Sequence, residues 1–284
     1  MSGWRQQLDY AWRVAGSGLC FALVGLVCVL LSVAVFPLIR LISSGDAATR
    51  WRVRQCVYHV YRSLIRVARA LGVISYELHG GERLLAPGQL VVANHPSLID
   101  VLFIGSQMPQ VDCIVKDALL RNPFLSAPVR WAGYIPNGEP ERLIETCAAT
   151  LHAGNSLLVF PEGTRSVPGQ PLKLKRGAAH IALASGCDLL PVTVVCRPSS
   201  LTKTDVWYRV PQRRPHWSVT VGEPIRLAGL LVPGETRTQA ARRVTEHLAE
   251  YFSARIAGVA PLPLTSQAAA RAGARAPAVS AAAS

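Results

Sequence analysis

The spacing of apolar residues changes along the chain, and it begins with an unbroken apolar stretch. Residues 15–39 carry no charged side chain and are rich in leucine and valine. This length exceeds the ~20 residues that a helix needs to cross a hydrocarbon core, and the stretch is too long and begins too late for a cleaved signal peptide. We therefore predict a membrane-anchoring segment over residues 1–45. Its glycines and Pro37 leave a spanning helix and a bent, re-entrant helix both open.

A periodic pattern follows over residues 46–71. Apolar residues recur there every three or four positions and arginines occupy the other faces, which predicts an amphipathic basic helix. Such a helix can lie on anionic lipid. It can equally pack against the following domain and expose its arginines to solvent, and the sequence favours neither arrangement.

From residue 72 onward, short apolar runs alternate with helical patterns. The runs that predict strands are 73–78, 90–93, 112–115, 134–135, 156–160 and 189–194. The patterns that predict helices are 141–153, 178–185 and 236–256. This alternation predicts an α/β domain over residues 72–259, with helices on both faces of its sheet. Two further segments, 206–210 and 217–221, alternate in hydrophobicity and predict a hairpin or a sheet edge.

Composition and charge narrow the class of protein. The chain has 284 residues, enough for one domain of about 200 residues plus appendages. Its mean hydropathy of +0.26 fits a membrane-associated protein. The net charge of +13 suits a membrane surface or a nucleic acid, but no nucleic-acid motif occurs, so we expect membrane lipid and no nucleic acid as a partner. Residues 260–284, rich in alanine and proline, predict a disordered tail.

The distribution of arginines predicts an orientation in the membrane. Only Arg5 and Arg13 precede the apolar stretch, whereas arginines are frequent from residue 40 to residue 69. This positive-inside bias places the α/β domain on the cytoplasmic face, and we expect a bacterial inner membrane. The seven cysteines, odd in number and without C-x-x-C spacing, fit a reducing compartment. We expect no metal site.

The first chemical motif is the run from Asn94 to Asp100, in which a histidine precedes an aspartate by five residues. On a continuous helix these two side chains would point about 140° apart. Pro96, however, holds His95 out of the helical region and suits the first helical position itself. We therefore predict a strand ending at residue 93, a turn at His95 and a helix from Pro96, so that Asp100 faces back toward the imidazole. The carboxylate would fix the tautomer and leave the other ring nitrogen free as a base; a buried histidine with no catalytic role would fit the same spacing.

The second motif, Phe160 to Ser166, follows the apolar run 156–160. Proline cannot continue a central strand, and Gly163 permits a positive φ and a close backbone approach. Arg165 can hold a phosphate or carboxylate with two parallel hydrogen bonds. Glu162 either orients a substrate hydroxyl or steadies Arg165. The same residues would also fit an exposed turn with a surface ion pair.

Together these motifs resemble the glycerolipid acyltransferase family, which includes the lysophosphatidic acid (1-acyl-sn-glycerol-3-phosphate) acyltransferases. The family block N-H-x4-D is matched at 94–100, and the block F-P-E-G-T-R-S at 160–166. Its remaining blocks are matched in order by Lys116, Leu119, Pro123, Gly133 and Ile135, by Leu174 to Ala178, and by Leu189 to Val194. The resemblance covers roughly residues 72 to 226. It implies a mixed, largely parallel sheet flanked by helices and preceded by the membrane helix.

The resemblance also implies roles for individual residues. His95 would be the general base and Asp100 its partner. Substrate contacts are implied for Asn94, Lys116, Glu162, Gly163, Thr164, Arg165, Lys175 and Arg176. The acyl donor would be acyl-CoA or acyl carrier protein, with no cofactor, and the acceptor a lysolipid, by default 1-acylglycerol-3-phosphate to give phosphatidate.

One departure from the family pattern concerns the acceptor. Many relatives that use glycerol phosphates have Ile-x-Arg where this chain has Ile135-Pro136-Asn137. A neutral asparagine cannot replace a guanidinium as a phosphate clamp, although Arg121 and Arg130 lie nearby in the sequence. Another lysolipid or an amino-acid lipid therefore stays open as acceptor. The sequence also leaves open a thioesterase, a covalent mechanism through Ser97, and a non-catalytic basic membrane-surface protein.

Overall fold

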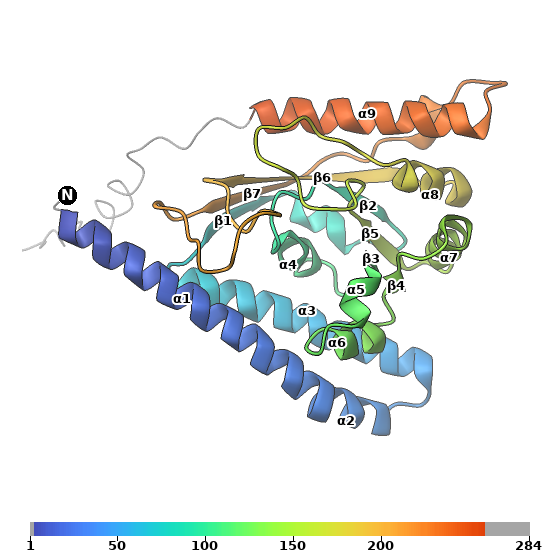
Figure 1. The fold of residues 1–284 in the computed structure, drawn as a ribbon. Helices are drawn as coiled ribbons and strands as arrows, with labels where there is room; N and C mark the ends of the chain where they lie inside the picture. Colours follow the sequence, from blue (N-terminus) through green and yellow to red (C-terminus); the bar gives the residue numbers. More distant parts are fainter. Residues whose placement is uncertain (1–2, 259–284) are drawn as a thin grey trace, which may run out of the picture.

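The N-terminal quarter of the protein is a long helical hairpin. The structure, a computed structural model, describes residues 3–258, so the predicted tail lies outside the described residues. Helix α1 (Gly3–Leu30) continues through a π-helical stretch (Leu31–Val35) into α2 (Phe36–Leu41), and α3 (Asp46–Ala70) runs back beside them (Figure 1). Within the described residues, 4–41 form one helix whose length and apolar composition suffice to cross a membrane.

A seven-stranded sheet forms the centre of the remaining chain. Its strands are β1 (Ser75–His79), β2 (Leu90–Ala93), β3 (Val111–Val115), β4 (Ile135–Pro136), β5 (Ser156–Val159), β6 (Leu189–Arg197) and β7 (His216–Val221). They lie in the order β1-β7-β6-β2-β5-β3-β4. All neighbouring pairs are parallel except β6 and β7. The predicted mixed, largely parallel sheet is confirmed.

Helices cover both faces of this sheet (Figure 1). They are α4 (Asp100–Gly105), α5 (Asp117–Leu120), α6 (Ser126–Ala132), α7 (Pro140–His152), α8 (Gly177–Ser185) and α9 (Arg237–Gly258), with short 3-10 turns at Gly81–Leu85 and Leu227–Leu230. The central strands are buried on both faces, as parallel strands under helices require. On β2, Val91 and Ala93 pack with residues of α3 and α4, whereas Leu90 and Val92 pack with residues of α7, α8 and α9.

The predicted strand over 206–210 is wrong. These residues lie in an irregular segment, residues 198–215, which joins β6 to β7 and which we call the strap. Trp207 packs there against α1: its ring lies 6.0 Å from that of Phe21, and a Cβ placed on Gly18 would come within 3.2 Å of it. The apolar residues of this segment therefore serve contact with a helix far away in the sequence, which a period-two pattern cannot distinguish from strand alternation. The segment 217–221 is a strand, as predicted, and pairs with β6 and β1.

A buried ion pair joins α3 to the sheet. The guanidinium of Arg54 contacts the carboxylate of Asp112 on β3, with side-chain exposures of 11% and 5%, and its Nε donates to the carbonyl of Ala132 at 2.9 Å. Burial raises the pKa of Asp112, and the charge of Arg54 acts in the opposite direction. Since α3 also contacts α4 and α6, this helix packs against the domain along much of its length.

Removing one partner of this pair should be costly. Asp112→Ala leaves the guanidinium of Arg54 buried without its counter-charge, and we expect a loss of about 3–5 kcal/mol in the free energy of unfolding. Denaturant unfolding in detergent measures it, with Asp117→Ala at an exposed position as the control. Equal stability of the two variants would contradict a structural role for the pair.

Candidate active site

The residues singled out by sequence gather at one edge of the sheet. Strands β2, β5 and β3 are mutually parallel, and Val92 is paired with Val159 in the register. His95 follows β2, Glu162 follows β5, and Lys116 follows β3 directly. The carboxyl ends of parallel strands are where α/β sheets bind ligands.

His95 and Asp100 meet, as predicted. Nδ1 of His95 lies 2.9 Å from Oδ2 of Asp100, and the backbone N–H of Ser97 donates to the same oxygen at 2.7 Å. The predicted helix from Pro96 is wrong, because α4 begins only at Asp100 and residues 97–99 form a turn. The N–H of Ser97 donates to the Asp100 side chain across this turn. The carboxylate therefore reaches Nδ1 of the imidazole without a preceding helical turn.

Asp100 and Phe160 hold the imidazole, and Glu162 holds the backbone of His95. Its ring stacks on Phe160 with centroids 4.2 Å apart, and the backbone N–H of His95 donates to Oε1 of Glu162 at 2.8 Å. The side chain stays 19% exposed, whereas that of Asp100 is completely buried. A neutral ring that donates from Nδ1 to the carboxylate carries its free lone pair on Nε2, which is the arrangement of a general base.

Burial dominates the electrostatics of Asp100. Desolvation raises the pKa of its carboxyl, while the hydrogen bonds from His95 and Ser97 act to lower it. The Oδ1 atom is buried and has no hydrogen-bond partner among the described residues. Interaction with the imidazole and with the Ser97 N–H therefore offsets only part of the cost of an ionised carboxylate at this position.

Glu162 joins the two motifs, and it does so differently from either expectation. Besides the N–H of His95, it accepts the hydroxyl of Ser166 at 2.7 Å. The N–H of Ser166 in turn donates to the carbonyl of His95 at 2.7 Å. No ion pair between Glu162 and Arg165 occurs in the described part of the chain. The buried carboxylate of Glu162 thus fixes the backbone around the histidine, and the structure shows no contact of it with Arg165.

Arg165 is held by the strap. Its Nη1 donates to the carbonyls of Leu201 at 3.0 Å and Thr202 at 2.8 Å. Leu201 O also accepts the backbone N–H of Leu98, inside the turn between His95 and Asp100. Sequence reasoning missed these strap carbonyls, because a carbonyl group is common to every residue and carries no signal in a motif.

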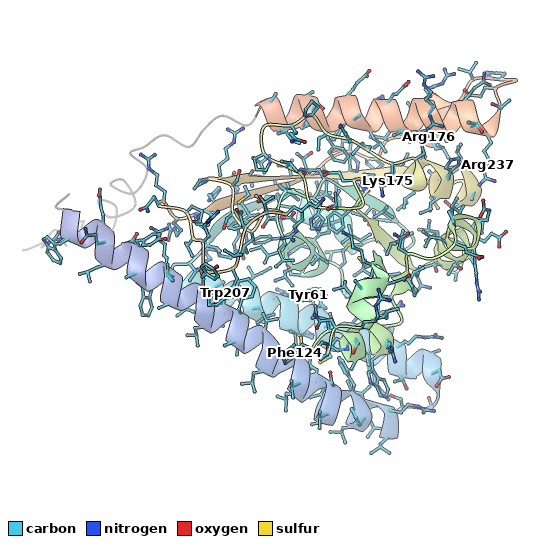
Figure 2. All side chains as sticks on the ribbon, in the orientation of Figure 1. Tyr61, Phe124, Lys175, Arg176, Trp207 and Arg237 are labelled. Atoms are coloured by element: carbon cyan, nitrogen blue, oxygen red, sulfur yellow. The ribbon has the colours of Figure 1, made fainter. Side chains whose placement is uncertain are left out.

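Most of the other residues that were predicted to contact a substrate are exposed or half-buried. Lys175 is exposed and lies over Gly163: a Cβ there would come within 3.1 Å of its Nζ, and the φ of +65° also favours glycine. Lys116 and Arg176 are exposed at the starts of α5 and α8, and Thr164 is half-buried between Gly163 and Arg165. Figure 2 shows Lys175 and Arg176 close together beside α8. The second motif therefore has the basic side chain of Lys175 directly over its glycine.

Asn94 differs from this group. Its side chain is 1% exposed, its amide nitrogen donates to Val194 O, and its amide oxygen accepts Val194 N–H, both at 2.7 Å. The residue therefore completes the pairing of β2 with β6 and sets the point where the chain leaves the sheet. These two hydrogen bonds hold the start of the His95 turn in place, and the substrate contact of Asn94 stays a prediction.

Ser97 is placed unfavourably for a covalent mechanism. Its side chain is completely buried, and its Oγ has no hydrogen-bond partner within residues 3–258. A serine nucleophile requires an adjacent base, and the Ser97 Oγ makes no hydrogen bond to the imidazole of His95. The described residues also contain no group of three or more histidine, cysteine, aspartate or glutamate side chains that could hold a metal ion.

An apolar pocket of about 90 Å³ adjoins the site. Residues of α1, α3, α4 and the strap line it. Its wall includes Ile99, which lies in the turn before α4, and Leu201, whose carbonyl accepts from Arg165. A separate hollow of about 270 Å³ is lined by Arg40, Arg50 and Arg130 at the far end of the hairpin. Arg130 therefore faces the α2–α3 corner.

Comparison with known proteins agrees with this geometry. Residues 75–195 match the family model for acyltransferases. The 1-acyl-sn-glycerol-3-phosphate acyltransferases of Saccharomyces cerevisiae and Pseudomonas aeruginosa are each 28% identical, over 51% and 50% of this chain and 48% and 58% of their own length. The chain thus spans about half the length of these curated relatives.

A solved structure shows the same fold. The crystal structure of the 1-acyl-sn-glycerophosphate (LPA) acyltransferase from Thermotoga maritima superimposes with a TM-score of 0.58 at 19% identity, covering 89% of this chain and all of that one. The family match over residues 75–195 confirms the resemblance that was drawn from the sequence motifs, and this part of the chain is similar to the acyltransferase family.

Proposed function

We propose that the protein is a membrane-bound O-acyltransferase that moves a fatty acyl group from acyl-CoA or acyl carrier protein to the hydroxyl of a lysolipid. The observation that carries the proposal is the contact between His95 and a fully buried Asp100 at the sheet edge. The default reaction converts 1-acylglycerol-3-phosphate to phosphatidate. The names of the relatives support this acceptor.

The proposed reaction is a direct transfer. Nε2 of His95 takes the proton from the acceptor hydroxyl, and the oxygen attacks the carbonyl carbon of the thioester. The new C–O ester bond forms as the C–S bond breaks, and the imidazolium returns the proton to the leaving thiolate. Asp100 keeps the ring in the required tautomer and stabilises the imidazolium. The reaction needs no cofactor beyond the acyl thioester, which is itself a substrate.

Charge and shape near the dyad support the substrates. Arg165 and Lys175, which belong to or lie over the second motif, can receive the anionic head of the acceptor, and Lys116 and Arg176 are exposed at the starts of α5 and α8. The apolar pocket bordered by Ile99 and Leu201 suits a hydrocarbon chain. A thioesterase would not need these basic side chains to bind its acceptor, because its acceptor is water.

Arg165→Lys tests the acceptor assignment. Lysine keeps the charge but loses the planar fork, so we expect the KM for 1-acylglycerol-3-phosphate to rise roughly tenfold to hundredfold while the KM for the acyl thioester stays unchanged. Steady-state kinetics with each substrate varied in turn decides this. A rise confined to the thioester KM would mean that the second motif binds the donor.

Membrane attachment rests on the exposed apolar face of the hairpin. Leu26 and Val33 are 66% and 74% exposed although strongly apolar, and they belong to the helix long enough to span a bilayer. The arginines that follow this helix support a cytoplasmic domain.

Charges on this face should release the protein from membranes. Placing glutamate at both positions, Leu26→Glu with Val33→Glu, costs about 2.5–3.5 kcal/mol for each charge at the bilayer centre. Flotation with vesicles in high salt measures the loss, and Val232→Glu, on an exposed loop, is the control. Undiminished binding of the double variant would refute the anchor.

The acceptor is identified by lipid mass spectrometry of the purified protein with an acyl thioester and a panel of lysolipids. Asn137 is exposed at the family's arginine position, and Arg130 faces the α2–α3 corner, lining a different hollow. Preference for 1-acylglycerol-3-phosphate supports phosphatidate synthesis. Preference for a lysolipid without a phosphomonoester, such as an amino-acid lipid, would replace the default acceptor.

A further inference from the structure

The strap, residues 198–215, connects the N-terminal helix to the acceptor side of the site. At its beginning, the carbonyls of Leu201 and Thr202 hold the guanidinium of Arg165, and Leu201 O also accepts the N–H of Leu98. Through these hydrogen bonds the strap contacts the second motif at Arg165 and the first motif at Leu98. The strap is otherwise irregular, so its position depends on what holds its other end.

Arg13 on α1 holds that other end. Its Nη1 donates to Pro211 O at 2.5 Å and its Nη2 to Gln212 O at 2.8 Å. The side chain is 1% exposed, and its one ion-pair partner within the described residues, Asp9, is 68% exposed. A buried guanidinium that depends mainly on two carbonyls is a specific clamp, because its rigid fork fixes both acceptors together.

A second contact fixes the middle of the strap on the same helix. Trp207 packs against Gly18 and Phe21 of α1 (Figure 2). The strap is thus held to α1 at Trp207 and at Pro211 and Gln212, and it connects α1 to Arg165 through the carbonyls of Leu201 and Thr202. A shift of the strap on α1 must reach the carbonyls that orient Arg165.

We propose that Arg13 is a positioning residue for Arg165, and that α1 thereby sets the affinity of the site for the anionic head of the acceptor. This inference rests on the proposed function, in which Arg165 grips that head. Arg13 touches no substrate; it acts through the strap carbonyls. The clamp gives the N-terminal helix a role in acceptor binding in addition to anchoring.

The test compares Arg13→Met with Arg13→Lys and with Arg5→Met, an exposed arginine on the same helix. We expect Arg13→Met to raise the KM for 1-acylglycerol-3-phosphate roughly threefold to thirtyfold, with no change in the thioester KM. Arg13→Lys, which keeps the charge but not the fork, should fall between, and Arg5→Met should match the wild type. With 1-acylglycerol, which has no anion to grip, all four proteins should be equal.

A double-mutant cycle separates positioning from a general loss of structure. In an Arg165→Lys background, Arg13→Met should have little further effect on the acceptor KM, because the two residues act on one interaction. Full additivity would overturn the proposal. So would a rise of similar size with 1-acylglycerol, since that would indicate general damage to the domain.

Hydrogen exchange gives a readout that does not depend on activity. The amide of Leu98 donates to Leu201 O, so Arg13→Met should make this amide exchange faster, while amides of β2 and β5 keep their protection. If the wild type transferred no acyl group, the proposed function would fail, and unchanged exchange at Leu98 would separately refute the clamp.

Discussion

Replacement of His95 by alanine is expected to abolish most acyl transfer while the protein stays folded. Loss of a general base alone typically reduces the rate by about 10²–10⁴-fold, and the loss is larger when the base acts as a unit with its partner. The effect should lie in kcat, because the imidazole contributes at the transition state and little to substrate affinity.

The fold should tolerate this change. The His95 side chain is partly exposed at 19%, and the hydrogen bonds of its backbone with Glu162 and Ser166 remain in the variant. His79→Ala, at an exposed histidine with 62% exposure, is the matched control for loss of an imidazole. Near-normal turnover of folded His95→Ala would exclude the proposed mechanism.

Asp100→Asn should be almost as damaging, through charge and not through shape. Oδ2 of Asp100 accepts from both the imidazole and the Ser97 N–H, and the oxygen of asparagine can keep both hydrogen bonds. The variant then lacks the negative charge that stabilises the imidazolium. A loss of about 10³–10⁴ in kcat is expected, the size associated with removing the carboxylate from such a dyad.

Whereas Asp100→Asn should lower activity, we expect it to be favourable for the stability of the folded protein as the pH rises. Burial raises the pKa of Asp100, so ionised Asp100 disfavours the folded state, and any contribution to stability is lost as the pH rises through that raised pKa. Asparagine stays neutral at every pH and escapes this cost. Denaturant unfolding at two pH values should therefore show that the wild type loses stability relative to Asp100→Asn as the pH rises; the reverse trend would contradict the account.

The sequence was sufficient for the parts of the fold that local pattern determines. The strands at 90–93 and 156–159 are short and mostly apolar, and both are central strands buried on both faces. The two chemical motifs begin directly after these strands. Parallel pairing of the strands alone therefore brings His95 and Glu162 to the same edge of the sheet. Proximity of the motifs was thus predictable from topology.

The details that failed depend on contacts between distant residues. Residues 206–210 of the strap were predicted to form a strand because their hydrophobicity alternates. In the structure they pack near α1 and the active site instead. Glu162, Arg165 and Arg13 each make at least one long-range hydrogen bond to a backbone group, which no side-chain pattern reveals. The hydrogen bonds of Asn94 with Val194 on β6 also join distant residues, and the motif alone did not predict them.

The start of α4 is a more local discrepancy. Pro96 suits the first position of a helix, which is why the helix was expected to begin there. Instead the Asp100 carboxylate accepts the Ser97 N–H across the intervening turn. Side-chain hydrogen bonds of this kind compete with helical ones and delay the helix. The prediction that His95 and Asp100 meet was therefore correct, although the path of the chain between them was not.

The central claim is that His95 drives direct transfer of an acyl group from a thioester to a lysolipid hydroxyl. Mass spectrometry of the products formed by wild type and His95→Ala, each given acyl-CoA and 1-acylglycerol-3-phosphate, tests it most directly. The account predicts phosphatidate in amounts equal to the free thiol released by the wild type, and almost none from the variant. Free fatty acid without phosphatidate, or equal phosphatidate from both proteins, would contradict it.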